Sequence, residues 1–91
     1  MSVVHIAVTG RVQGIGFRWF VRERATALDL AGWVRNLEDG GVEVAASGPD
    51  AAISQFVAAV QEGPPGALVR QVVQLPSVAE ALLTKPFAII R

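Results

Sequence analysis

The chain has 91 residues, 52% of them hydrophobic, and its eight basic and eight acidic side chains cancel. That length suits one domain over residues 1–91, and the lack of cysteine excludes disulfides, thiolate metal sites and cysteine nucleophiles. The mixed, balanced charge offers no basic surface to nucleic acid or anionic lipid, and no apolar run approaches the roughly 20 residues of a membrane span. No signal peptide is visible, so we expect a monomeric, cytoplasmic domain without membrane or nucleic-acid partners.

The first third of the chain predicts a strand, a loop and a helix. Residues 3–9 are rich in β-branched side chains that alternate between two faces, as in a strand. Residues 10–16 contain three glycines and fit neither period, which indicates a loop. From Phe17 apolar side chains recur at helical spacing, with Arg24 extending along the edge of the apolar stripe. The helix should end near Asp29, although glycine enters the left-handed conformation more readily than Asp.

The remainder of the chain predicts a hairpin, a second helix and two further strands. Residues 32–37 and 41–46 are strand-like, and the Asp-Gly pair between them is a strong hairpin signal. Pro49 suits the first position of a second helix, which a Gly-Pro-Pro sequence should end. Residues 67–75 alternate weakly as a strand, and residues 87–91 form a short apolar ending suited to a last strand.

This order of elements, β-α-β-β-α-β with a short terminal strand, predicts an α+β fold. Two βαβ-like halves joined by a hairpin give an antiparallel sheet with both helices on one face, the ferredoxin-like α/β sandwich. The fold by itself leaves function open, because enzymes, RNA-binding modules and small-ligand sensors all use it.

Residues 10–18, GRVQGIGFR, combine three glycines with the first turn of a predicted helix. Glycine permits backbone angles that turn successive N–H groups toward one point, and the helix adds its own unpaired N–H groups and the positive end of its dipole. Arg18 lies in that first turn, where a guanidinium can make two parallel bonds to a phosphate. The spacing fits neither a Walker loop nor the dinucleotide fingerprint. The stretch indicates an anion cradle, with a plain strand-to-helix turn as an equally weighted alternative.

Asn36 stands near the end of a predicted strand, although asparagine is a poor strand residue. The simpler explanation is that it begins the hairpin turn. The other is that its strand lies near the first helix, as the predicted topology allows, so that its amide faces residues 10–18.

Residues 10–18 closely resemble the first signature of the acylphosphatases, and residues 32–36 (GWVRN) with Asp39-Gly40 resemble their second. The similarity extends along the chain in size and element order. It implies a single acylphosphatase-like domain over residues 1–91, in which Arg18 binds the phosphoryl group and Asn36 positions the attacking water. The implied phosphate cradle consists of the backbone amides of Val12, Gln13, Gly14, Ile15, Gly16 and Phe17.

Two positions depart from the family pattern. Leu37 stands where a threonine commonly follows the asparagine, so we expect a polar contact beside the site to be absent. Asp29 replaces the usual glycine, which bears on helix stability more than on chemistry. Neither departure touches Arg18 or Asn36.

The implied reaction is hydrolysis of a small-molecule acyl phosphate to a carboxylate and inorganic phosphate, without metal or other cofactor. The sequence offers no metal-ligand cluster, nucleophile or carboxylate pair, and the single histidine, His5, is interpreted as a packing or surface residue. An alkyl phosphate would need a general acid or a metal for its leaving group. A carboxylate leaves unprotonated, since its conjugate acid resembles Glu, with a pKa of about 4.3. Water then needs only in-line positioning, and the phosphate product should bind the loop as an inhibitor.

Two alternatives stay open at this point. A non-catalytic anion-binding domain would keep the cradle and lack turnover, but both Arg18 and Asn36 are retained. An RNA-binding module of this topology would need exposed aromatic side chains on central strands and a basic surface. The predicted strands offer Trp33 and Phe87, and the net charge is zero. Trp19, on the solvent side of the first helix, allows a weak self-contact, with a monomer as the expectation.

Overall fold

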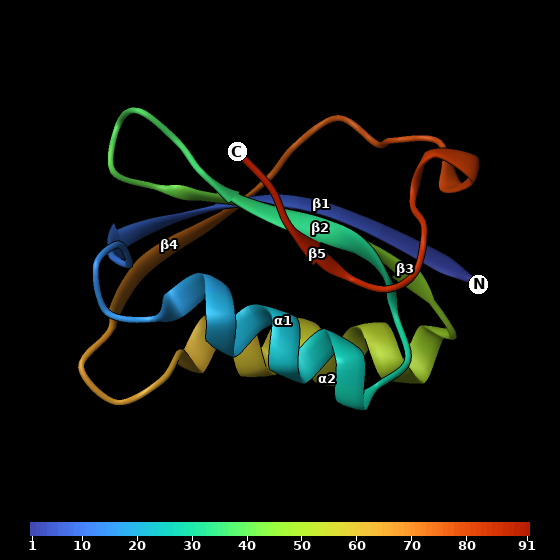
Figure 1. The fold of residues 1–91 in the computed structure, drawn as a ribbon, viewed down its shortest axis with the longest axis horizontal. Helices are drawn as coiled ribbons and strands as arrows, with labels where there is room; N and C mark the ends of the chain where they lie inside the picture. Colours follow the sequence, from blue (N-terminus) through green and yellow to red (C-terminus); the bar gives the residue numbers. More distant parts are fainter.

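The computed structural model describes residues 1–91 as a five-stranded sheet with two helices packed on one of its faces (Figure 1). In chain order the elements are β1 (Ser2–Arg11), α1 (Phe17–Ala27), β2 (Ala31–Asn36), β3 (Val42–Gly48), α2 (Asp50–Glu62), β4 (Leu68–Gln74), a short 3-10 helix η1 (Glu80–Leu82) and β5 (Ala88–Ile89). This order and layering confirm the predicted ferredoxin-like α+β fold. None of the helices is long and apolar enough to cross a membrane.

The sheet has the strand order β4-β1-β3-β2-β5. Its first four strands pair antiparallel, as predicted, but β5 runs parallel to β2, with Trp33 beside Ala88 and Val34 beside Ile89. The sheet is therefore mixed rather than wholly antiparallel. β5 can pair in parallel with β2 because β3, α2 and β4 lie between them in the chain, a connection far longer than a hairpin. The segment after β4 passes around one end of the sheet before β5 reaches the edge of β2 (Figure 1).

Alternation along the strands turns one face of the sheet toward the helices. Ile6 and Val8, on one side of the alternating strand predicted over residues 3–9, lie on this face and are buried. Most of the other core side chains come from both helices and the neighbouring strands: Phe17, Val21 and Ala25 of α1, Ile53, Phe56 and Val60 of α2, Val34 of β2 and Val44 of β3. The ring of Phe87 lies edge-on to that of Phe56, with centroids 6.1 Å apart, so the end of the chain closes the core.

Helix α1 ends in a left-handed residue, as the sequence predicts. Asp29 has a φ of 57°. The amides of Leu30 and Asp29 donate to the carbonyl oxygens of Ala25 (2.9 Å) and Thr26 (3.0 Å), the bonds of a Schellman motif with Asp in the usual place of glycine. The Asp29 carboxylate also accepts a hydrogen bond from Nζ of Lys85 at 2.9 Å, an exposed pair of little energetic weight.

Several boundaries differ slightly from the sequence prediction, and the last strand covers only Ala88–Ile89 of the predicted residues 87–91. Pro49 directly precedes α2 instead of occupying its first turn, and its ψ of 145° is extended rather than helical. Strand β1 continues through Arg11, past the first glycine of the motif, and its pairing with β4 shifts register between Thr9 and Gly10. The loop that leads into α1 is therefore limited to residues 12–16.

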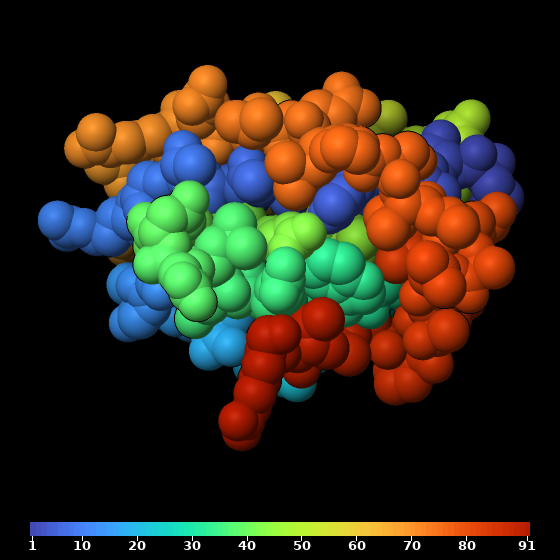
Figure 2. Space-filling view, turned by 90° about the horizontal axis from the view of Figure 1, so that it is seen from above, coloured from blue at the N-terminus to red at the C-terminus, as the bar shows by residue number.

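The face of the sheet away from the helices carries a compact polar cluster. One ring nitrogen of His5 lies 2.6 Å from Oε2 of Glu43, and the other lies 2.6 Å from the carbonyl oxygen of Pro76. Nε of Arg35 donates to Oε1 of Glu43 at 2.6 Å, and its guanidinium carbon lies 5.9 Å from the ring centroid of Trp33. Figure 2 looks onto this face, which the chain after β4 borders along one side. His5 is thus a packing residue that ties this chain segment to the sheet.

Glu43 is the charge centre of this cluster, which we call the outer cluster (His5, Arg35, Glu43). Burial raises the pKa of the Glu43 carboxyl, but hydrogen bonds from His5 and Arg35, and their charge, outweigh burial and hold the pKa below its ordinary value of 4.5. Both carboxylate oxygens have partners. The outer cluster is therefore a satisfied polar network, of the kind that stabilises a fold.

Candidate active site

The loop between β1 and α1, residues 12–16, presents backbone N–H groups without partners. Gly14 and Gly16 both have a φ of 77°, in the left-handed region that glycine enters without strain. No N–H of residues 12–16 donates to another backbone carbonyl, and the amide of Phe20 makes the first bond of α1, to the Gly16 carbonyl at 2.9 Å. No side chain caps the helix, so the leading N–H groups of α1 are free as well. The loop and the helix start together form a run of free amide donors.

Gln13 fastens this loop to the β2–β3 hairpin. Its Nε2 donates to the carbonyl oxygens of Leu37 (2.8 Å) and Gly41 (2.7 Å). The same two residues close the hairpin, since the Leu37 amide donates to the Gly41 carbonyl at 2.8 Å. The sequence prediction assigned only the backbone amide of Gln13 and missed this role of its side chain. The presence of a long carboxamide side chain within a glycine-rich loop could have indicated that it bonds to a neighbouring backbone segment. The contact holds the loop next to the end of β2.

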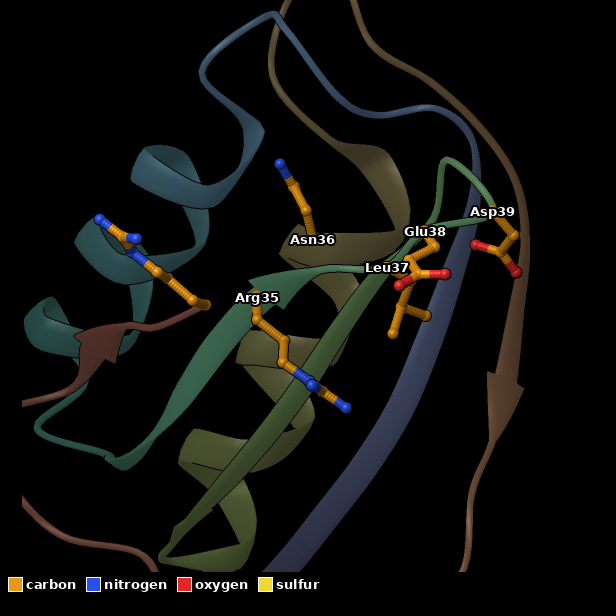
Figure 3. Close-up of a pocket in the computed structure, with 6 residues that line it drawn as sticks. Arg35, Asn36, Leu37, Glu38 and Asp39 are labelled. Carbon is orange, nitrogen blue, oxygen red and sulfur yellow. The ribbon is translucent and has the colours of Figure 1, made fainter.

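Asn36 occupies that end of β2, paired with Val42 of β3. Its side chain points toward the segment that leads into α1, whereas the side chain of the neighbouring Arg35 points to the other face of the sheet (Figure 3). Oδ1 of Asn36 is buried and has no hydrogen-bond partner. The apolar side chain of Leu37 offers it none. A buried oxygen without a partner is unusual in proteins and calls for an explanation.

Arg18 and Asn36 line one cavity of about 170 Å³. Its walls come from the loop, the first turn of α1, the end of β2 and β5: Val12, Gln13, Gly14, Gly16, Phe17, Arg18, Trp19, Asn36 and Ile89. Arg18 is the only charged side chain among them, and it takes part in none of the ion pairs of the chain. A free guanidinium and free amide donors, with no carboxylate in the lining, make this cavity suitable for an anion.

The structure thus brings most of the predicted site residues together. Ile15 is absent from the lining because its side chain packs against the core, but its predicted role concerned the backbone amide, which makes no bond to a backbone carbonyl. The ring of Phe17 is buried, so this residue can offer only its backbone. Trp19 and Ile89 line the cavity without having been predicted. The sequence placed Trp19 only on the solvent side of the helix, and Ile89 reaches the cavity because β5 pairs with β2.

A larger depression of about 600 Å³ lies along the β2–β3 hairpin and shares Asn36 with the first cavity (Figure 3). It is lined by Arg35, Asn36, Leu37, Glu38, Asp39 and Arg91. The carboxylates of Glu38 and Asp39 would repel a phosphoryl group, and Arg35 is already paired with Glu43. The smaller cavity is therefore the candidate active site, and we call it the loop cavity.

Comparison with known proteins agrees with this geometry. Residues 4–89 match the family model of the acylphosphatases. An acylphosphatase of Syntrophotalea carbinolica is 52% identical over 66 residues, which cover 72% of this chain and 72% of that relative. The crystal structure of an acylphosphatase from Bacillus subtilis matches over 100% of both chains, with a TM-score of 0.86 and 42% identity. HypF of T. kodakarensis, 30% identical, matches with a TM-score of 0.84 over 100% of this chain and 12% of that longer one.

The family match includes both segments that build the loop cavity, the β1–α1 loop and the end of β2. It confirms the resemblance drawn from residues 10–18 and 32–36. Sequence identity, family model and fold agree over most of the chain. The chain therefore belongs to the acylphosphatase family.

Proposed function

We propose that the protein hydrolyses acyl phosphates to a carboxylate and inorganic phosphate, without a metal ion. One observation carries the proposal. Arg18, whose guanidinium forms no ion pair, and Asn36, whose buried Oδ1 has no hydrogen-bond partner, line the same small cavity, beside a run of free amides. The guanidinium and amides suit a phosphoryl anion, and the carboxamide suits a water molecule.

Arg18 and the amides of residues 12–16 bind the phosphoryl oxygens in this proposal. A guanidinium donates two parallel hydrogen bonds to two such oxygens, and the loop amides surround the remaining charge. That charge is present in the bound substrate and is redistributed during transfer, so the same donors act in both states. Because no carboxylate lines the loop cavity, nothing there opposes the incoming anion.

Asn36 positions the attacking water. Its Oδ1 accepts a hydrogen bond from the water, which leaves an oxygen lone pair directed at phosphorus. The new O–P bond forms as the bond from phosphorus to the acyl oxygen breaks, and the departing carboxylate takes that electron pair. A carboxamide is not a base, so the water proton passes to a phosphoryl oxygen. Positioning of this kind is a large source of rate acceleration.

The leaving group explains how so few side chains suffice. A carboxylate departs without a proton, since its conjugate acid has a pKa of about 4.3, like that of Glu. The loop cavity accordingly needs no general acid, and its lining includes no carboxylate or imidazole that could serve as a base or a metal ligand. No three His, Cys, Asp or Glu side chains of the chain are grouped so as to hold a metal ion.

The proposal also takes the protein as a monomer that works in the cytoplasm. The chain contains no cysteine, which suits a reducing compartment. Its large exposed hydrophobic side chains are spread over several elements: Met1, Trp19, Leu68, Val73, Leu82 and Ile90. Light scattering during size-exclusion chromatography should therefore give the mass of a single chain, and a mass of two chains would contradict this part of the proposal.

An assay of phosphate release tests the proposed function. The purified protein is incubated with acetyl phosphate and with benzoyl phosphate, with and without a chelator. We expect hydrolysis of both, unchanged by the chelator. Loss of activity with chelator, restored by a divalent ion, would show that the metal-free mechanism is wrong. Saturable phosphate binding with no turnover of either substrate would instead identify an anion-binding domain.

A further inference from the structure

We propose, on the basis of the proposed function, that Trp19 and Ile89 form the subsite for the acyl group, and that it favours flat, uncharged acyl groups such as a benzoyl group. Both side chains line the loop cavity beside Arg18 and Asn36. Their apolar surfaces have no evident part in binding a phosphoryl anion. Arg18 and the loop amides contact the phosphoryl group and Asn36 contacts the water, so the acyl group is the one part of the reactants that these residues do not bind.

The exposure of Trp19 supports this role. Trp19 is 56% exposed, although it lines the loop cavity. Trp19 is the third residue of α1 and directly follows Arg18, so the helix start fixes both side chains relative to one cavity. An indole offers a rigid flat surface that loses little conformational freedom on contact with another flat group. Trp19 is therefore placed to stack on a group that extends from the cavity.

The direction of the reaction puts the acyl group on this open side. In phosphoryl transfer the attacking and leaving oxygens lie roughly in line, on opposite sides of phosphorus. The buried Oδ1 of Asn36 sets the water on the inner side of the loop cavity. The leaving carboxylate must then face the outer side, where Trp19 is exposed to solvent.

The size and charge of the loop cavity restrict what this acyl group can be. The volume of about 170 Å³ is well below the roughly 300–1,000 Å³ of cavities that enclose a whole drug-sized ligand. A bulky acyl group such as benzoyl therefore extends toward the rim. Arg18 is the only charged side chain in the lining and is engaged by the phosphoryl group, so a charged acyl group finds no partner within the loop cavity. The apolar surfaces of Trp19 and Ile89 favour an uncharged one.

The second tryptophan provides a matched control. Trp33 belongs to β2, and its ring contacts His5 edge-on with ring centroids 5.9 Å apart, within the polar surface of the helix-free face. The Arg35 guanidinium lies over the same ring. Trp33 does not line the loop cavity. Changing it should alter tryptophan content and local packing without altering the acyl subsite.

The test compares two substrates in four proteins: the parent, Trp19→Ala, Trp19→Phe and Trp33→Phe. The measured quantity is the ratio of kcat/KM for benzoyl phosphate to that for acetyl phosphate. We expect Trp19→Ala to lower this ratio on the order of 10-fold, the scale of losing one aromatic contact. Trp19→Phe should retain most of the ratio, and Trp33→Phe should leave it unchanged. An unchanged ratio in Trp19→Ala, or an equal fall in Trp33→Phe, would overturn the proposal.

Failure of the proposed function gives a different result. If the parent hydrolyses neither substrate, that function is wrong, and the subsite is then tested by calorimetric binding of phenylphosphonate and methylphosphonate. The parent should prefer phenylphosphonate, and Trp19→Ala should lose that preference while still binding methylphosphonate. Equal binding of the two phosphonates by the parent would overturn the acyl subsite independently of catalysis.

Discussion

The two polar regions of the molecule, the outer cluster and the loop cavity, differ in how completely their groups are paired. In the outer cluster both oxygens of Glu43 and both ring nitrogens of His5 have a partner at 2.6 Å. In the loop cavity, Arg18 forms no ion pair, and Oδ1 of Asn36 is buried without a partner. Unsatisfied polar groups destabilise a fold, so their concentration in one cavity indicates groups kept free for a ligand.

Adjacent residues contribute to the two regions. Arg35 and Asn36 follow one another at the end of β2, and strand alternation sends their side chains to opposite faces of the sheet (Figure 3). Arg35 joins the satisfied cluster, and Asn36 joins the unsatisfied cavity. The comparison predicts that changes in the loop cavity will reduce catalysis with little loss of stability. Changes in the outer cluster should do the reverse.

Arg18→Lys should cause the largest loss of activity. An ammonium keeps the charge but cannot reproduce the planar grip of two parallel hydrogen bonds. We expect kcat/KM for acetyl phosphate to fall on the order of 10³-fold, at the lower end of what a phosphoryl-binding arginine contributes. Both KM and kcat should change, because phosphoryl charge is present before and during transfer. Kinetics close to those of the parent would show that Arg18 does not bind the phosphoryl group.

Asn36→Ala should lower kcat on the order of 10²-fold or more, the scale of lost positioning of a reactant. The inhibition constant of inorganic phosphate should stay close to that of the parent, because Asn36 contacts the water rather than the phosphoryl group. The fold should survive, since the change removes an unpartnered buried oxygen, and circular dichroism checks this. A folded variant with the parental kcat would leave Asn36 as a turn residue only.

Gln13→Glu probes the link between the loop and the hairpin. A carboxylate cannot donate hydrogen bonds to the carbonyl oxygens of Leu37 and Gly41, so the loop loses both contacts. We expect a fall in kcat/KM of about 10-fold, smaller than for Asn36→Ala, because misplacing donors is less damaging than removing the water-positioning group. Gln13→Ala, which removes the donor without adding charge, should give a smaller fall. No change in either variant would show that the contact does not matter for the site.

Glu43→Gln should have the smallest effect on activity, with kcat/KM within about 2-fold of the parent. It should lower the free energy of unfolding by about 2 kcal/mol at pH 7, because the hydrogen bonds to charged partners become weaker. The folded-state pKa of Glu43 is depressed, so its ionised form stabilises the protein above the ordinary value of 4.5. That stabilisation is lost as pH falls from 4.5 through the folded-state pKa. Urea unfolding of both proteins at several pH values should show their difference shrinking below pH 4.5. A constant difference would contradict the role given to the carboxylate.

The fold could be predicted from the sequence because it rests on local patterns, whereas the role of Asn36 was implied by the family resemblance and stays a prediction. Alternation and helical spacing identified the elements, and the glycine-rich segment with Arg18 indicated the anion loop. Contacts that depend on long-range pairing could not be read this way. Ile89 reaches the loop cavity only through the parallel pairing of β5 with β2, and the Gln13 side chain finds its acceptors in a hairpin more than twenty residues away. A short sequence window contains no sign of either contact.

The central claim is that the unpaired groups of the loop cavity bind the phosphoryl group. The most direct test is to titrate the ¹⁵N-labelled protein with inorganic phosphate and to follow the NMR shifts of its amides. We expect the largest shifts at the backbone amides of residues 12–18 and at the side-chain amide of Asn36. They should follow one saturation curve, and its constant should equal that for competitive inhibition by phosphate. The chemical shifts of the amides of His5, Arg35 and Glu43 should not change. Shifts concentrated on the outer cluster or along the β2–β3 hairpin, with none in residues 12–16, would contradict the assignment of the loop cavity as the active site.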